Sequence, residues 1–168
     1  MKGIGNSTTI RFDVTDHKKA YKVLLSLTES VAMRLRNANS ICGVVSIEIR
    51  TSELFMYSHQ RKLFRRTNIT NEIFEVVKEL FDEGWKGERV RHLGVRVSDL
   101  ASDEFMQLSL FDNKNISKSQ ALDAAIDGIR TKFGHSAIMR ATFADNEFHS
   151  MMGGPGADSD YPVMSSIL

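Results

Sequence analysis

A short stretch near the middle of the chain combines positive charge with small hydrogen-bonding side chains. Between Phe55 and Arg66 there is no carboxylate, and there are four cations: Arg61, Lys62, Arg65 and Arg66. Ser58 and Gln60 stand just before them. Arg and Lys neutralise phosphate, while hydroxyl and amide groups donate hydrogen bonds to a sugar-phosphate chain at close range. The stretch therefore predicts contact with a polyanion, although an ordinary solvated sheet surface carries similar charges.

A second candidate is a pentapeptide farther along the chain, with the sequence Gln107-Leu108-Ser109-Leu110-Phe111. Its three apolar side chains suit the subsites of a pocket, and the Gln107 amide suits main-chain groups at the pocket mouth. The alternative is a further strand or core segment, because the same residues alternate between polar and apolar. Its position in an acidic, linker-like stretch after the predicted folded unit favours a docking peptide.

Charge is unevenly distributed in this chain of 168 residues, although the net charge is only +1. Residues 1–98 hold 17 Lys and Arg against 11 Asp and Glu, whereas residues 99–168 hold 5 against 10. A basic module followed by an acidic segment predicts two tasks, of which only the first suits a polyanion.

The composition argues against disulfide-rich, metal-binding, membrane and secreted proteins. The single cysteine, Cys42, cannot build a disulfide framework, and the five histidines lack the paired spacing of a metal site. The sequence shows neither a long apolar run nor a signal-peptide layout, so we expect a cytoplasmic protein with no membrane partner.

The hydrophobic periodicity predicts which elements position these residues. Apolar side chains recur every three or four residues in two segments and every second residue in others. The predicted order is β-α-β-β-α-β, over residues 8–12, 17–37, 41–50, 54–64, 71–83 and 90–98. Asp16 is the predicted N-cap of the first helix, and Gly84 is the predicted stop of the second.

This order predicts an α+β fold, a two-layer sandwich in which two helices cover one face of a four-stranded sheet. The other face is then open and is the place for chemistry. Its candidate residues include Ser46, Glu48 and Arg50 on the second strand, residues 58–62 on the third, and Arg96 on the fourth. Glu48 is the exception, because a carboxylate there repels phosphate.

Four segments together resemble a known family. They read GIGNSTT, GVVSIEIRTSE, YSHQRKL and HLGVRVSDL, in that order. They are similar to the C-terminal little finger domain of Y-family translesion DNA polymerases of the ImpB/MucB/SamB, DNA polymerase IV type. The pentapeptide at 107–111 resembles the motif by which bacterial polymerases bind the sliding β-clamp. The resemblance covers residues 1 to about 111.

The resemblance implies that the sheet lies in the DNA major groove and contacts the backbone of both strands. Carried onto this chain, it implies primer-template DNA and the sliding β-clamp as partners, with Gln107, Leu108, Ser109, Leu110 and Phe111 on the clamp. The implied DNA-binding residues are Ser7, Thr8, Arg50, Ser58, His59, Gln60, Arg61 and Arg96.

The resemblance and the composition together divide the chain into five parts. We expect a linker (1–7), a DNA-binding little finger domain (8–100), a clamp-binding linker (101–116), a tail with an amphipathic helix (117–143) and a flexible terminus (144–168). The helix is predicted at about 118–133, ended by Gly134 and followed by a short extended piece.

No catalysis is expected from these residues alone. In the family, the carboxylates that hold Mg²⁺ belong to a palm region that precedes the little finger, so no cofactor, metal or catalytic residue is predicted here. The alternative function is a stand-alone RNA-binding or regulatory α+β module. RNA-binding sheets of this topology display stacking aromatic residues, for which Tyr57 is the candidate.

Overall fold

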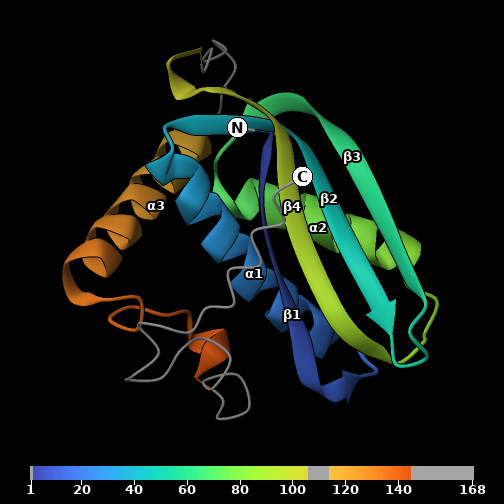
Figure 1. Cartoon of the computed structure of the whole chain (residues 1–168). Helices are drawn as coiled ribbons and strands as arrows, with labels where there is room; N and C mark the ends of the chain where they lie inside the picture. Colours follow the sequence, from blue (N-terminus) through green and yellow to red (C-terminus); the bar gives the residue numbers. More distant parts are fainter. Residues whose placement is uncertain (1, 106–113, 145–168) are drawn as a thin grey trace. The chain divides into compact units, whose positions relative to one another are not determined.

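The computed structural model describes residues 2–105 and 114–144. The chain consists of two compact units, which meet between residues 112 and 113. The first holds the sheet and two α-helices, and the second holds one α-helix (Figure 1). Among the helices of the described residues, none is both long and apolar enough to cross a membrane.

The first unit is built from six main elements in the predicted order. They are β1 (Gly3–Val14), α1 (His17–Asn37), β2 (Ser40–Thr51), β3 (Met56–Thr67), α2 (Thr70–Gly84) and β4 (Val90–Ser102), followed by a 3-10 turn at Asp103–Phe105. The strands pair antiparallel throughout, in the spatial order β1-β4-β2-β3. This confirms the predicted fold class.

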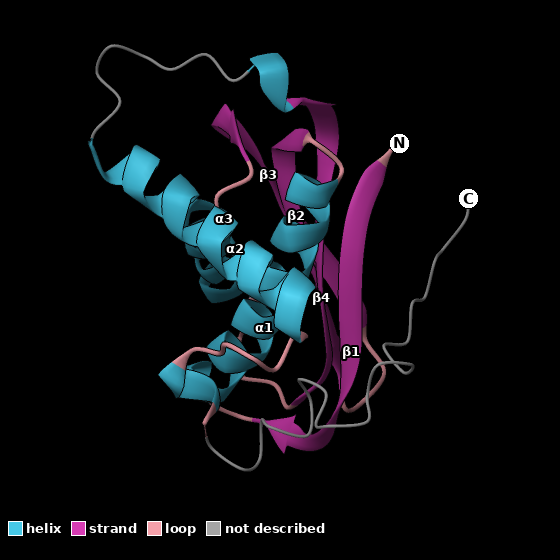
Figure 2. Cartoon of the chain, turned by 90° about the vertical axis from the view of Figure 1, so that its left-hand side faces the viewer, coloured by secondary structure: helices cyan, strands magenta, loops and turns pink. Residues whose placement is uncertain are grey.

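Both helices lie on the same side of the sheet (Figure 2). Their apolar stripes pack against the strand residues that point the same way, and the side chains of Leu24, Leu35, Ile47, Ile73 and Leu93 are fully buried between the two layers. No α-helix of residues 2–105 lies over the opposite side. The sheet therefore has one face in the core and one open face, as an amphipathic antiparallel sheet should.

The first helix begins where its cap predicts: the Asp16 carboxylate accepts a hydrogen bond from the Lys19 amide at 2.9 Å. The preceding segment differs from the prediction. The sequence predicts a linker over residues 1–7, but β1 begins at Gly3 and its residues pair with β4 from the Gly3↔Ser98 position onward. Ile4 explains this difference, because its buried side chain anchors the start of the strand between two small, outward-facing glycines.

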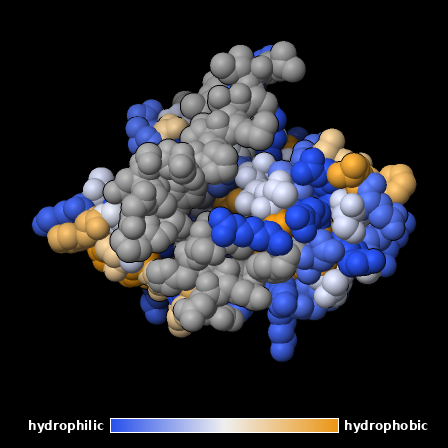
Figure 3. Space-filling view, turned by 60° about the horizontal axis from the view of Figure 1, so that its bottom comes forward, coloured by the Kyte–Doolittle hydropathy of each residue, from blue (hydrophilic) through white to orange (hydrophobic). Residues whose placement is uncertain are grey.

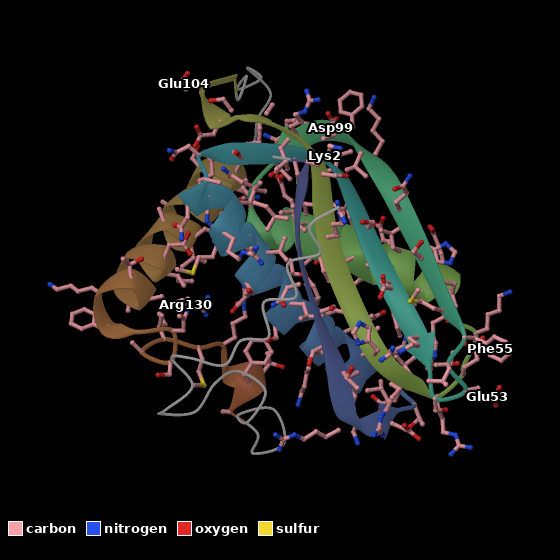
Figure 4. The ribbon with its side chains drawn as sticks, viewed as in Figure 1. Lys2, Glu53, Phe55, Asp99, Glu104 and Arg130 are labelled. Atoms are coloured by element: carbon pink, nitrogen blue, oxygen red, sulfur yellow. The ribbon has the colours of Figure 1, made fainter. Side chains whose placement is uncertain are left out.

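The turn between β2 and β3 displays three consecutive apolar side chains, Leu54, Phe55 and Met56, which are 64% to 75% exposed. Hydrogen bonds from the Thr51 amide to Phe55 O and from the Leu54 amide to Thr51 O hold the turn, with Leu54 at φ 69. Figure 4 shows Glu53 and Phe55 at this turn and Asp99 at the opposite end of the sheet. Viewed from the turn's end, the described surface is mostly hydrophilic with separate apolar patches (Figure 3).

The second unit contains α3 (Lys114–Phe133), which begins four residues before the predicted helix. Gly134 ends it at φ +93, a conformation that glycine adopts without a Cβ penalty. The extended piece predicted after it is wrong: a turn follows, and a 3-10 helix forms at Ala141–Phe143. The Arg130 guanidinium holds the turn through Nε and Nη2, each 3.3 Å from Ile138 O.

Candidate nucleic-acid interface

Strand register defines which side chains share the open face. Alternate residues point to opposite sides of a strand, and paired residues point to the same side. Four pairings centred on β2 and β4 join outward residues: Val44↔Ser98, Ser46↔Arg96, Glu48↔Gly94 and Arg50↔His92. The pairings with the edge strands β1 and β3 add further outward residues. The polar residues of the open face are Ser7, Thr9, Ser46, Glu48, Arg50, Ser58, Gln60, Lys62, His92, Arg96 and Ser98.

Arg96 lies at the β1 side of this face and is exposed. Its side chain crosses two glycines of β1: a β-carbon on Gly5 would lie 3.3 Å from Arg96 Cβ, and one on Gly3 would lie 3.2 Å from Arg96 Nε. The glycines therefore let the guanidinium lie low across the strand. Within the described residues, Arg96 has no ion-pair partner, so its charge is available to a ligand.

The β3 edge of the open face carries Ser58, Gln60 and Lys62, all of them exposed. They pair with Glu48, Ser46 and Val44 of β2 respectively. Lys62 has no carboxylate partner among the residues that the structure describes. This edge therefore presents the hydroxyl, amide and ammonium groups that the sequence predicts for phosphate contact.

Two predicted residues of β3 lie on the helix side instead. His59 pairs with the buried Ile47, and its ring lies so close to α2 that a β-carbon on Gly84 would be 2.6 Å from His59 Cδ2. The Arg61 guanidinium forms ion pairs with Glu79 and Glu83 of α2. The prediction that these two side chains share the open face is therefore wrong, because His59 lies against Gly84 of α2 and Arg61 pairs with acidic residues of the same helix.

The strand register also shows which of the neighbouring residues Thr8 and Thr9 lies on the open face. Thr8, predicted from the resemblance, pairs with the buried Leu93 and so points to the helix side. Thr9 is the residue on the open face, opposite His92. Neither Thr9 nor His92 was predicted. The alternation of Leu93, Val95 and Val97 could have identified His92, because it extends the outward series of Gly94 and Arg96 by one step.

A connected polar cluster from three strands lies on the open face, close to the end of β2 and the start of β4. Thr9 Oγ1 and His92 Nδ1 are 3.0 Å apart, and Arg50 donates from Nη2 to Thr9 Oγ1 at 3.4 Å. On the other side of the imidazole ring, His92 Nε2 lies 3.6 Å from Glu48 Oε1. With Lys62 and Arg96, the open face has three cations and one carboxylate among its described residues, which gives it a positive balance.

The environment of His92 makes the stability of the unit dependent on pH. Burial of the ring, and secondarily the Arg50 charge, lower the pKa of His92 below its ordinary value of 6.5, while Glu48 opposes the shift. The unfolded chain therefore binds the proton more tightly. The stabilising contribution is present above pH 6.5 and is lost as pH falls through the lowered pKa.

We expect thermal denaturation between about pH 5 and 8 to show this loss on the acid side, and His92→Gln to flatten it. An equal acid-side loss in the variant would assign the effect to other groups.

A prediction about Arg61 follows from its ion pairs with α2. Arg61→Gln should lower the free energy of unfolding by at most about 1 kcal/mol, since these ion pairs are at the surface and solvent screens them. It should leave the affinity for DNA unchanged, because its side chain points away from the open face. Urea denaturation and DNA titration of the same variant check both statements. A large loss of affinity with normal stability would place DNA on the helix side.

The predicted clamp-binding residues 107–111 lie outside the described residues. Within the described ranges, no group of three or more His, Cys, Asp or Glu side chains is arranged to hold a metal ion. Cys42 is buried, and burial raises the pKa of its thiol to about 12. It is therefore an unreactive core residue.

Comparison with known proteins decides the family. Residues 1–110 match the impB/mucB/samB family C-terminal domain. The chain belongs to this family. The match includes the whole sheet and both helices that pack on it, so the open face described above is a surface of the impB/mucB/samB C-terminal domain.

Relatives of this impB/mucB/samB chain include DNA polymerase IV of Clostridium acetobutylicum, 40% identical over 147 residues. DNA polymerase IV 2 of Bacillus subtilis is 39% identical over 145 residues. The alignments cover 88% and 84% of this chain but 37% and 35% of those relatives, so the chain spans little more than a third of their length.

Among solved structures, the chain is similar to one described as a complex of beta-clamp processivity factor and little finger domain of PolIV. The TM-score is 0.51 at 15% identity, covering 65% of this chain and 98% of that one. At this identity the likeness shows the fold. It agrees with the two-layer arrangement of the first unit.

Proposed function

We propose that the first unit binds the sugar-phosphate backbone of primer-template DNA through its open face. The observation that carries the proposal is the arrangement of Arg50, Lys62 and Arg96 on one uncovered side of the sheet, with no carboxylate pairing any of them in the described residues. Hydroxyl and amide groups lie between these cations. Such a surface holds phosphates at several points without reading sequence.

The dimensions of the sheet support a grip on both strands of a duplex. Neighbouring strands are about 4.8 Å apart, so the outer strands β1 and β3 are separated by about 14 Å. The major groove of B-DNA is about 12 Å wide. Arg96, near β1, and Lys62, on β3, can therefore each lie over one backbone at the two sides of the groove. Binding of this kind releases condensed counterions and weakens as salt rises.

We further propose that residues 107–111 tether the protein to a sliding clamp. Relatives of this chain include DNA polymerases IV, and one solved structure that shares its fold is a complex of a beta-clamp with a little finger domain. Leu108, Leu110 and Phe111 supply the apolar anchors, and Gln107 supplies a hydrogen-bonding amide. Tethering raises the local concentration of the DNA-binding unit at the primer end without adding DNA contacts.

The setting that we propose is damaged-DNA bypass by a translesion polymerase in the cytoplasm, in which this segment positions DNA. The polymerase reaction of such a protein uses a divalent ion such as Mg²⁺. The described residues do not fit that ion, because they contain no cluster of three metal-ligating side chains. We therefore assign no catalytic step to them.

The alternative of an RNA-binding module is less well supported. Its candidate stacking residue, Tyr57, pairs with the buried Ile49 and points to the helix side. A base cannot stack on a ring that faces the helices.

Fluorescence anisotropy with a labelled primer-template duplex and a labelled single-stranded RNA of equal charge tests this function. We expect tighter binding of the duplex, with an affinity that falls steeply as salt rises. Preference for the RNA, or duplex binding that is insensitive to salt, would contradict the proposal.

A further inference from the structure

Glu48 is the one acidic side chain among the described residues that line the open face. It lies on β2, an inner strand of the sheet, and its side chain is 46% exposed. A carboxylate at this position opposes phosphate binding, so the phosphate contacts proposed above give it no favourable role. Its position must suit a part of the DNA other than the phosphates.

The geometry of the sheet indicates which part that is. The outer strands lie beside the backbones, and the inner strands β2 and β4 then lie over the groove between them. The major groove admits a two-stranded β-ribbon and displays base edges on its floor. With DNA on the open face in this way, the shorter Glu48 side chain is directed at base edges, whereas the longer side chains of Arg50 and Arg96 on the same inner strands extend to the backbones.

His92 and Gly94 are the neighbours of Glu48 on β4. His92 Nε2 lies 3.6 Å from Glu48 Oε1, and the other ring nitrogen is fixed by Thr9 at 3.0 Å. Opposite Glu48 on β4 is Gly94, where a β-carbon would lie 3.3 Å from Glu48 Cβ. Gly94 places no side chain opposite Glu48, so the half-exposed carboxylate is open to a ligand.

We propose that Glu48 accepts a hydrogen bond from the exocyclic amine of a base in the major groove. This inference rests on the proposed DNA binding and specifies the groove contact of the same face. Adenine presents N6–H₂ and cytosine presents N4–H₂ in the major groove, so every base pair offers one such donor. A carboxylate on an inner strand of the face can therefore contact DNA without a strong sequence preference.

The test moves the exocyclic amine of each adenine from the major groove to the minor groove. In a duplex of mixed A and T sequence, every adenine is replaced by 2-aminopurine, which still pairs with thymine but has no major-groove amine. We expect the full chain to bind this duplex about fivefold more weakly, the effect of losing one hydrogen bond of ordinary strength. A duplex with 2,6-diaminopurine, which keeps the major-groove amine, should restore the affinity.

Variants of Glu48 test whether this side chain causes the weaker binding of the 2-aminopurine duplex. Glu48→Ala should bind the adenine and 2-aminopurine duplexes equally, whereas Glu48→Gln, whose amide oxygen still accepts, should keep a preference for adenine. The readout is the ratio of the two affinities, because removal of the negative charge changes both of them alike. An equal affinity of the wild-type chain for both duplexes, with steep salt dependence retained, overturns the groove contact alone. Absence of salt-dependent duplex binding overturns the proposed function itself.

Discussion

Replacement of Arg50, Lys62 and Arg96 by glutamine in one variant is expected to reduce the slope of log affinity against log salt by about three. Each phosphate contact of B-DNA contributes close to one unit to this slope. At about 0.1 M salt the same change should weaken duplex binding by roughly several hundredfold. The folded unit should survive, since these side chains lie on the open face outside the apolar core.

The matched control removes three charges from the opposite side. Arg61, Arg65 and Lys78 are paired with Glu79, Glu72 and Glu75, and all three lie between β3 and α2 or on α2 itself. Replacement of these three by glutamine gives the same net charge as the open-face variant but should leave the salt slope near its wild-type value. Equal losses of slope in the two variants would mean that DNA responds to overall charge and not to the open face.

The second large effect concerns the clamp. Replacement of Leu110 and Phe111 by alanine should abolish binding to a purified bacterial β-clamp, since buried apolar anchors contribute about 2 kcal/mol or more each at such interfaces. The affinity for duplex DNA should stay unchanged, because the residues proposed to bind DNA lie elsewhere in the chain. Surface plasmon resonance on immobilised clamp and anisotropy on duplex measure the two affinities separately.

The control for this variant is a second pair of apolar residues. Leu122 and Phe133 of α3 are 52% and 66% exposed, so their replacement by alanine removes a similar apolar area from the chain. Clamp binding should persist in this control. If the control lost clamp binding while the 107–111 variant kept it, the tether would have to be reassigned to α3.

The helices were predictable because their periodicity is strong. The predicted 17–37 is the observed range of α1, and the predicted 71–83 differs from α2 by one residue at each end. The two-layer arrangement follows from this pattern, because two amphipathic helices need one common apolar face to pack on. The open face was predictable for the same reason.

The orientation of β3 was not predictable from its residues. Its segment from Ser58 to Lys62 is polar at every position, so no alternation of apolar and polar side chains marks which residues face the helices. The register is set instead by β2, whose alternation is clear, and by the acidic residues of α2 that pair with Arg61 and Arg65. Only the three-dimensional pairing separates Ser58 and Gln60 from His59 and Arg61.

A register shift adds to this difficulty near the end of β3. Between the pairs Val44↔Lys62 and Cys42↔Thr67, β2 advances by two residues and β3 by five. Such a bulge releases side chains from the regular ladder, and Phe64 within it is fully exposed. The periodicity of the helices gives no information on where a bulge lies in a strand.

Site-directed crosslinking tests the central claim, that duplex DNA lies on the open face, most directly. Because Cys42 is buried and the pKa of its thiol is raised to about 12, a single introduced cysteine can be labelled with a photo-crosslinker while the native thiol stays unmodified. Gln60→Cys places the label on the open face, and Glu79→Cys places it on α2. We predict that irradiation crosslinks duplex DNA to the label at position 60 and not to that at 79. Crosslinking from position 79 alone would contradict the account.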